Sequence, residues 1–286
     1  MGRLIWGAVL RLAPLLGMIL RDLLMSSSDY DKRFGGIQRL YGTAAQQILQ
    51  EMHIFVAGVG GVGSWVVEAL ARSGVGRITF IDGDTVDVTN TNRQLHTLSS
   101  TIDLPKVVVM AGRVREINPE CDVTAIHEYM NMENMVGHLE GGYDYVIDAL
   151  DSIQFKSTMI AWCKRNKVPI IATGGAGGLT DPTMIQVVDL SKTYNDPLAA
   201  KVRSRLRSDF NFTRNAKRSF GVECVFSSQQ QVYPKDDGTV SHEKPGIHGV
   251  SLDCRFGYGS ATFVTATFGF MAASRAINKT LKKRLA

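Results

Sequence analysis

Between residues 53 and 173, short apolar runs alternate with longer amphipathic stretches. Apolar runs of about four to eight residues bounded by turn residues are typical of buried strands, and longer stretches with apolar positions three and four apart are typical of helices. This pattern predicts strands at 53–57, 77–82, 121–127, 143–147 and 168–173, and helices at 64–73, 103–118 and 153–167. Such alternation is typical of a parallel sheet with helices on both faces. We therefore expect an α/β fold with a Rossmann-like, mostly parallel sheet.

After Gly178 the pattern changes. It predicts a strand at 184–189, a basic helix at 196–210, an extended segment at 222–233, a segment rich in Gly, Ala and Thr at 257–272, and a basic helical tail. No linker separates the two halves. We therefore divide the chain into a Rossmann-like core at 25–178 and a C-terminal continuation at 179–286, which adds to the sheet and forms a substrate-facing lobe.

The first 24 residues are apolar but poorly suited to crossing a membrane. Arg11, Pro14 and Arg21 interrupt the segment, and its longest charge-free stretch covers only residues 12–20. A spanning helix needs about 20 apolar residues. Met25 and the polar residues after it are typical of a natural start. We interpret residues 1–24 as an extension or upstream-start segment, and peripheral membrane contact through it stays open.

Composition narrows the class of protein. The chain has 286 residues, of which 44% are hydrophobic and 21% charged, which excludes collagen, coiled coils and disordered tails. The cysteines form no CxxC pair, which argues against a zinc knuckle and against a disulfide framework. A reducing cytoplasm is the expected location. The four cysteines are Cys121, Cys163, Cys224 and Cys254.

The formal charge of +5 permits a polyanionic partner without requiring one. Basic residues cluster in two places, and between residues 201 and 218 only Asp209 opposes them. Arg203 and Arg207 are four apart and would share a helix face. A solvated helix face and a nucleic-acid surface both explain such a cluster. The clusters are Lys201, Arg203, Arg205, Arg207, Arg214, Lys217 and Arg218, and in the tail Arg275, Lys279, Lys282, Lys283 and Arg284.

A glycine-rich turn follows the first predicted strand. Gly58, Gly60, Gly61 and Gly63 stand between that strand and a predicted helix, where glycines permit a tight turn, phosphate approach and close helix packing. Asp82 lies 19 residues after Gly63 at the next strand end, where a carboxylate can accept bonds from a ribose. The pattern predicts an adenine nucleotide site, without distinguishing NAD from ATP.

Charged residues at later strand ends favour ATP. Asn90, Arg93 and Lys106 follow Asp82, and Asp151 follows the strand at 143–147. Two extra cations suit a triphosphate and have no use in an NAD site. Asp151 could hold Mg²⁺ through its oxygens. Its alternative role is to cap the helix at 153–167, and the alternative for either cation alone is simple solvation.

This set resembles the ThiF/MoeB/HesA family of adenylating enzymes, which are related to ubiquitin-activating enzymes. The resemblance implies that Asp82 holds the ATP ribose, that Asn90, Arg93 and Lys106 hold phosphates, and that Asp151 supports Mg²⁺. It also implies a homodimer in which an arginine ahead of the first strand, Arg33 or alternatively Arg39, reaches the partner's ATP. The matching residues are Gly58, Gly60, Gly61, Gly63, Asp82, Asn90, Arg93, Gln94, Lys106 and Asp151.

Most of the remaining chain resembles one branch of that family, the tRNA threonylcarbamoyladenosine dehydratases. That likeness implies ATP-dependent cyclisation of a modified base in tRNA through an acyl adenylate, with Arg93, Lys106 and Asp151 as catalytic residues. Whether a cysteine desulfurase or sulfur-acceptor system is a partner stays open. The similar segments are 33–42, 88–96, 146–156, 173–190, 196–207, 222–234 and 261–270.

Several features separate this branch from its rivals. The chain lacks the paired CxxC zinc motifs common in enzymes that adenylate sulfur carriers, and no cysteine matches the thioester cysteine of ubiquitin-type enzymes. Ring closure within the substrate needs no such thiol. An adenylating enzyme for a carrier protein, a nicotinamide-dependent oxidoreductase and a non-catalytic scaffold are the alternatives. The glycine run at 174–178 is either a base-approach site or a flexible turn.

Overall fold

The computed structural model describes residues 29–235, 237–243 and 259–286. Residues 29–41 are helical and lead into the first half of the sheet. The elements of that half are α2 (Thr43–Glu51), β1 (His53–Ala57), α3 (Gly63–Arg72), β2 (Arg77–Ile81), η1 (Val88–Asn90), α4 (Lys106–Ile117), β3 (Asp122–Ile126), α5 (Met135–Leu139), β4 (Tyr145–Asp148), α6 (Ile153–Arg165) and β5 (Ile170–Thr173). The second half adds η2 (Pro182–Met184), β6 (Ile185–Asp189), η3 (Leu190–Lys192), α7 (Pro197–Asp209), β7 (Glu223–Ser227), β8 (Tyr233–Pro234), β9 (Val240–Ser241) and α8 (Thr262–Arg284).

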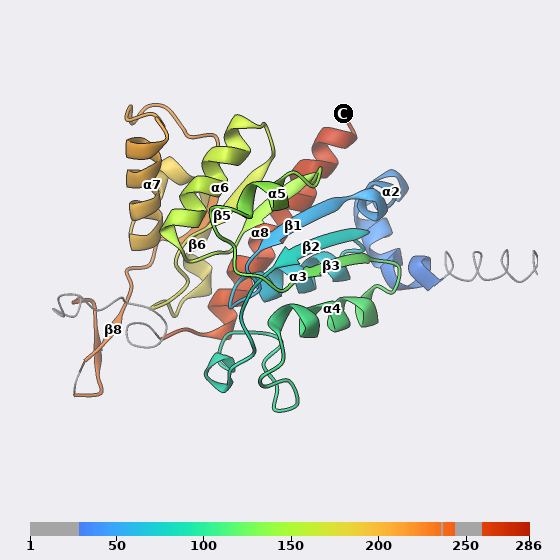
Figure 1. The fold of residues 1–286 in the computed structure, drawn as a ribbon, viewed down its shortest axis with the longest axis horizontal. Coiled ribbons are helices and arrows are strands. Elements are labelled where there is room, and N and C mark those ends of the chain that lie inside the picture. Colours follow the sequence, from blue (N-terminus) through green and yellow to red (C-terminus); the bar gives the residue numbers. More distant parts are fainter. Residues whose placement is uncertain (1–28, 236, 244–258) are drawn as a thin grey trace, which may run out of the picture.

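Seven strands form one sheet in the order β3-β2-β1-β4-β5-β7-β6. All neighbouring pairs are parallel except β6 with β7 (Figure 1). The predicted α/β class with a mostly parallel sheet is therefore confirmed. The chain builds outward from β1 to β3, then returns to place β4 on the other side of β1. Ligands of such sheets bind beyond the carboxyl ends of the strands where the order reverses, here β1 and β4.

Successive side chains of a strand point to opposite faces of the sheet, and here both faces are apolar and covered by helices. On β1, Ile54 and Val56 join one apolar cluster with α3, α4 and α8, whereas Phe55 and Ala57 join the opposite cluster with α6 and α7. A strand buried on both faces reads as a continuous apolar run. This explains why the run HIFVA carries no polar alternation.

The C-terminal helix α8 is a core helix. It packs along α3, and a Cβ on Gly269 would lie only 2.7 Å from the carbonyl oxygen of Val62. Arg275 pairs with Glu223 on β7 at 2.5 Å, and Lys279 reaches the same carboxylate at 3.1 Å. The basic tail is thus partly neutralised by the sheet that it covers, and its last lysines remain exposed.

Within the part of the chain that the structure describes, no helix is both long and apolar enough to cross a membrane. The apolar segment at 1–24 lies outside the described residues. A small antiparallel ribbon of β8 and β9 projects from one side of the molecule (Figure 1).

Candidate nucleotide site

The glycine turn between β1 and α3 has the tight geometry that the sequence predicts. Gly58 has φ +84, and its N–H donates to the carbonyl of Ile81 at 2.9 Å. A Cβ on Gly63 would lie 1.8 Å from the carbonyl oxygen of Gly58. Real Cβ atoms cannot approach so closely, so both glycines are required by the turn itself.

Gly60 and Gly61 are not required by the packing of the turn. A Cβ on Gly60 would meet nothing nearer than the Gln94 side chain at 3.9 Å, and one on Gly61 would meet Arg93 Cγ at 3.5 Å. These are ordinary contacts, so packing does not require either glycine. Both stand just ahead of α3, where the helix N-terminus attracts an anion. Their small size keeps the backbone open to a phosphate.

Asp82 ties the turn to the end of β2. Its carboxylate accepts the N–H of Val59 at 2.8 Å and the N–H of Asp84 at 2.9 Å. Burial raises its pKa, and the nearby Lys106 ammonium opposes that rise. Each carboxylate oxygen has further lone pairs, so Asp82 can still accept hydrogen bonds from a ribose.

Arg93 lies over the glycine turn because its backbone is held from two helices. Its carbonyl accepts Trp65 Nε1–H at 3.1 Å from α3 and the Thr265 hydroxyl at 3.2 Å from α8. Its guanidinium donates to the carbonyl of Thr89 at 2.8 Å and to Asn92 Oδ1 at 3.1 Å. The sequence did not identify Trp65 or Thr265, because only the packing of α8 on α3 brings them to this loop.

Lys106 begins α4 and points into the same region. Its Nζ lies 2.7 Å from Asp84 Oδ2, and its side chain is only 6% exposed. The hydroxyl of Tyr129 donates to the other oxygen of Asp84 at 2.9 Å. Asp84 is therefore the partner that orients the ammonium. Asp84 stands two residues after Asp82, and this short spacing could have identified it as a residue of the site. The sequence analysis gave it no role.

Asn90 and Gln94 are both buried in the loop that carries Arg93. Asn90 Oδ1 accepts the N–H of Asp87 at 3.4 Å and so closes the short turn η1. Gln94 Oε1 is buried without a hydrogen-bond partner. Its Nε2 is the atom nearest to the open side of Gly60. Both side chains therefore border the turn where a phosphate would lie.

The two carboxylates after β4 have separate roles. Asp148 is fully buried and pairs with Lys156 Nζ at 2.9 Å. Asp151 is exposed, and the cap of α6 is Ser152, whose Oγ accepts the N–H of Phe155 at 3.5 Å. Ser152, and not Asp151, therefore caps α6. Lys156 was not identified from the sequence.

Within the described ranges, no group of three or more His, Cys, Asp or Glu side chains could hold a metal ion by itself. Mg²⁺ in nucleotide sites is commonly held by one or two carboxylates together with the phosphates. One exposed carboxylate at the end of β4, the strand beside β1, fits that donor set. Asp151 is suited to Mg²⁺ only together with a bound nucleotide.

Arg33 lies at the other end of the fold. Its guanidinium pairs with Asp29 at 2.8 Å and donates to the carbonyls of Glu116 and Ile117 at the end of α4. Since Lys106 begins that helix, Glu116 lies about 15 Å further along its axis. Arg33 is therefore distant from the nucleotide site of its own protomer. Its role, like that of the exposed Arg39, stays a prediction.

The described cysteines are poor nucleophiles. Cys121, Cys163 and Cys224 are free and buried. Burial raises the pKa of Cys121 and of Cys163 to about 12, and the pKa of Cys224 also rises through burial. Thiolates react, whereas thiols do so poorly. Cys254 lies outside the described residues.

Basic residues between 201 and 218 differ in exposure. Arg203 donates to the Thr193 hydroxyl, and Arg207 donates to the carbonyl of Thr213 at 3.4 Å while stacking over Phe220. The shared face that the sequence predicts for this pair is therefore engaged within the protein. The exposed cations of the stretch are Lys201, Arg214, Lys217 and Arg218.

His96 is the most deeply buried imidazole of the site. It is 1% exposed, and neither ring nitrogen has a hydrogen-bond partner. Burial, with a smaller contribution from Lys106, lowers its pKa from 6.5 to about 4. The folded state therefore binds fewer protons than the unfolded state between these values, and stability falls as the pH falls through that range.

We expect His96 to remove about 2 kcal/mol of stability between pH 7 and pH 5. Urea denaturation of the wild type and of His96→Phe at both pH values measures this. The difference between pH 7 and pH 5 should be about 2 kcal/mol smaller in the variant. His127→Phe, at an exposed position, is the matched control and should keep the wild-type difference. Equal pH dependence in all three proteins would contradict the assignment.

Together, the sheet order and the turn define a Rossmann-type α/β protein whose strand ends at β1, β2 and β4 are suited to an adenine nucleotide. The family model described as ThiF family matches residues 32–285. The chain therefore belongs to the ThiF family, as its motifs imply.

Several of its relatives share one name. The chain is 54% identical over 258 residues to the Escherichia coli tRNA threonylcarbamoyladenosine dehydratase, covering 90% of this chain and 96% of that protein. The Bacillus subtilis protein of the same name is 43% identical over 68% of this chain and 74% of its own length. The E. coli structure in complex with ATP has a TM-score of 0.79 at 50% identity, covering 89% of this chain and 96% of that chain.

Proposed function

We propose that this protein is an ATP-dependent tRNA threonylcarbamoyladenosine dehydratase. The single observation that carries the proposal is the 54% identity that extends over 96% of the E. coli enzyme. It includes the second half, where α7, β7 and α8 stand beyond the nucleotide site. A molybdopterin-synthase adenylyltransferase of Salmonella typhimurium matches only 48% of this chain at 32% identity. Carrier-protein adenylation is therefore less well supported.

The reaction proceeds in two steps. An oxygen of the threonyl carboxylate attacks the α-phosphorus of ATP, a P–O bond forms, and pyrophosphate leaves. An atom of the neighbouring carbamoyl group then attacks the activated carbonyl carbon, AMP leaves and one proton is lost. The carboxylate is itself the nucleophile, so the protein's task is positioning and charge stabilisation.

The residues of the site are suited to that task. Asp82 would receive the ribose, and the turn at Gly60 and Gly61 would lie against the phosphates. Lys106, already oriented by Asp84, and Arg93, held over the turn, would neutralise charge on the departing pyrophosphate. Asp151 would hold Mg²⁺, which when bound supplies further charge neutralisation at the phosphates.

We also propose that the protein works as a homodimer in the cytoplasm. The dimer is supported by the position of Arg33, which is far from the nucleotide site of its own protomer. Arg33 lines a cavity there together with Arg72 and Arg113. An interface there would bring the arginines of one protomer to its partner. Sedimentation at micromolar concentration tests this, and a fully active monomer would contradict it.

The function is tested with ATP, Mg²⁺ and tRNA that carries threonylcarbamoyladenosine. We expect AMP and pyrophosphate in equal amounts, with nucleosides from the digested tRNA lighter by one water. Unmodified tRNA is the control and should give neither product. Pyrophosphate exchange with a diglycine-tailed carrier protein but not with tRNA would instead favour the carrier-adenylating function. We expect the purified reaction to need no cysteine desulfurase.

For tRNA binding, we expect the double variant Lys217→Ala/Arg218→Ala to flatten the slope of log affinity against log salt by about one to two units. Both residues are exposed, so each can release counterions by contacting phosphate. ATP affinity should be unchanged. The matched comparison is Lys282→Ala/Lys283→Ala in α8, which should bind tRNA like wild type. The prediction fails if the first variant binds like wild type at every salt concentration.

A further inference from the structure

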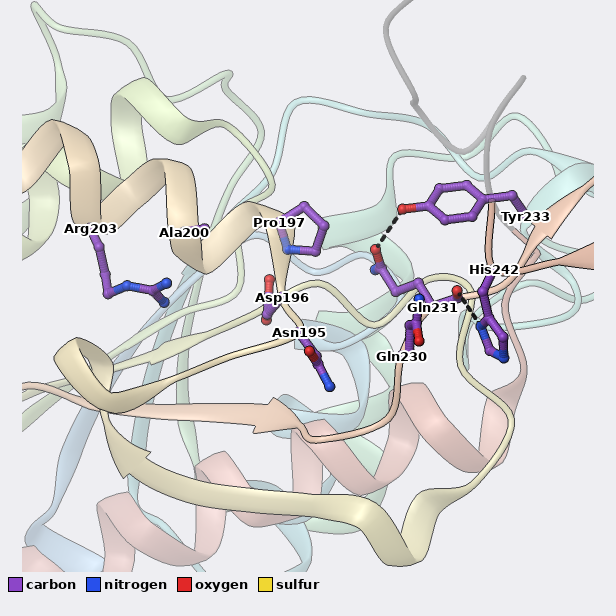
Figure 2. A pocket seen from close by; sticks show the side chains of 9 residues that line it. All are labelled: Asn195, Asp196, Pro197, Ala200, Arg203, Gln230, Gln231, Tyr233 and His242. Carbon is purple, nitrogen blue, oxygen red and sulfur yellow. Dashed lines mark hydrogen bonds between the residues drawn. The ribbon is translucent and has the colours of Figure 1, made fainter. Parts of the chain in front are cut away.

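A cavity of about 320 Å³ lies beside the end of β5, outside the nucleotide site (Figure 2). Its floor is buried, because Asp196, Gln231 and Tyr233 are each less than a tenth exposed. Its volume is at the lower end of the range for small-ligand pockets, about 300–1,000 Å³. The lining residues are Asn195, Asp196, Pro197, Ala200, Arg203, Gln230, Gln231, Tyr233 and His242.

The first wall is fixed by Asp196. One oxygen of its carboxylate caps α7 by accepting the N–H of Ala199 at 2.9 Å, and the other accepts the N–H of Gly175 at 3.0 Å. A Cβ on Gly174 would lie 1.8 Å from that carboxylate. Gly174 is therefore required for the start of α7 to lie against the end of β5, whereas a Cβ on Gly175 would meet nothing nearer than 3.6 Å.

The opposite wall is a hydrogen-bonded group around Gln231 (Figure 2). Gln231 Nε2 donates to the carbonyl of Gly177 at 2.9 Å. The imidazole Nδ1 of His242 lies 3.0 Å from the carbonyl oxygen of Gln231. A carbonyl can only accept, so Nδ1 donates in this contact.

The cavity thus offers donors, acceptors and flat groups together. Its amides and Asp196 supply both kinds of hydrogen-bonding group, while the guanidinium of Arg203 and the rings of Tyr233 and His242 are planar. Proteins recognise unstacked bases in single-stranded RNA with this combination of stacking and edge hydrogen bonds. We propose, on the basis of the function proposed above, that this cavity receives the substrate's modified nucleobase after it is unstacked from the tRNA.

The position of the cavity fits that substrate. Asp196 contacts Gly175 directly after β5, and only β4 separates β5 from β1, whose end begins the glycine turn. Two strand spacings are about 10 Å. A threonylcarbamoyl group has about two peptide-like units and so spans about 7 Å when extended. The extended group covers most of that separation, so a base in the cavity can direct its carboxylate across the end of β4 toward the nucleotide, alongside the glycine run at 174–178.

Filling the cavity tests the proposal. Ala200 lines it from the exposed side of α7, so Ala200→Trp should place an indole where the base would lie. Ser204→Trp is the matched control, because Ser204 is exposed on the same helix one turn further and does not line the cavity. Both variants should melt like the wild type.

We expect Ala200→Trp to lower single-turnover conversion of modified tRNA by about 10²-fold, because the carboxylate can no longer be positioned. Its affinities for ATP and for whole tRNA should stay within about twofold, since tRNA affinity rests mainly on phosphate contacts. The free nucleoside N6-threonylcarbamoyladenosine, titrated in the presence of a non-hydrolysable ATP analogue, should bind the wild type and Ser204→Trp but not Ala200→Trp.

Normal conversion by Ala200→Trp would overturn the proposal while leaving the proposed function intact. So would a loss of whole-tRNA affinity that accounts for the lower rate, because the cavity would then belong to the phosphate-binding surface. Failure of the wild type itself to convert modified tRNA would instead remove the proposed function on which the cavity assignment rests.

Discussion

Replacing Lys106 with alanine should lower the rate of adenylate formation by about 10²–10³-fold, the usual effect of removing one preorganised charge contact. The ammonium is nearly buried at the start of α4, and Asp84 holds it at 2.7 Å. It therefore needs no reorganisation when charge develops on the leaving pyrophosphate. ATP–pyrophosphate exchange with modified tRNA measures the effect, and Asp151→Ala should lose activity to a similar extent.

Two further variants separate chemistry from folding. Lys106→Gln is only one atom shorter and still carries an N–H donor that can point toward Asp84, yet it should be as inactive as Lys106→Ala because it carries no charge. Lys283→Ala removes an exposed cation from the end of α8 and should leave exchange unchanged. Near-normal exchange by folded Lys106→Ala would overturn the assignment of this lysine.

Lys156→Met should lower the free energy of unfolding by about 3–5 kcal/mol, because it leaves the Asp148 carboxylate buried without its partner. The two side chains are 2% and 0% exposed. Burial already raises the pKa of Asp148, and Lys156 opposes that rise. Such a loss corresponds to a fall in Tm of about 6–20 °C in a domain of this size. Thermal and urea denaturation at neutral pH measure it.

The double variant Asp148→Leu/Lys156→Met is the control for this pair. Replacing both members of a buried ion pair with apolar residues is often neutral, whereas removing one member is costly. The double variant should therefore recover most of the stability that Lys156→Met loses. A Lys156→Met variant as stable as the wild type would contradict this prediction, because the buried Asp148 carboxylate would then not need its partner.

Much of the nucleotide half could be predicted from the sequence. The strand β1 has the predicted bounds, and α6 begins at the predicted residue. Apolar runs and helical periodicity are local signals, so they predict these elements without knowledge of the fold. The glycine turn was also predictable, because a tight turn between strand and helix constrains each residue within a short stretch of chain, and Asp82 was predictable because it directly follows the next apolar strand.

The second half was harder to predict. The segment 257–272 reads as a sequence rich in Gly, Ala and Thr, yet from Thr262 onward it belongs to α8. Its small residues are needed where α8 crosses α3, as Gly269 shows. A small residue can serve a turn or a close helix crossing, and only the partner helix decides between them.

The sequence by itself determined the class of fold, the glycine turn and the charged residues at the strand ends that we propose contact the nucleotide, because each depends on neighbours within a few residues or on the order of strands. Only the tertiary structure decided the partners of those charges. Lys106 meets Asp84, Lys156 meets Asp148, and Arg203 belongs to a cavity instead of an open basic face. A charge in the sequence carries no record of its burial, and burial is set by elements far apart in the chain that pack together.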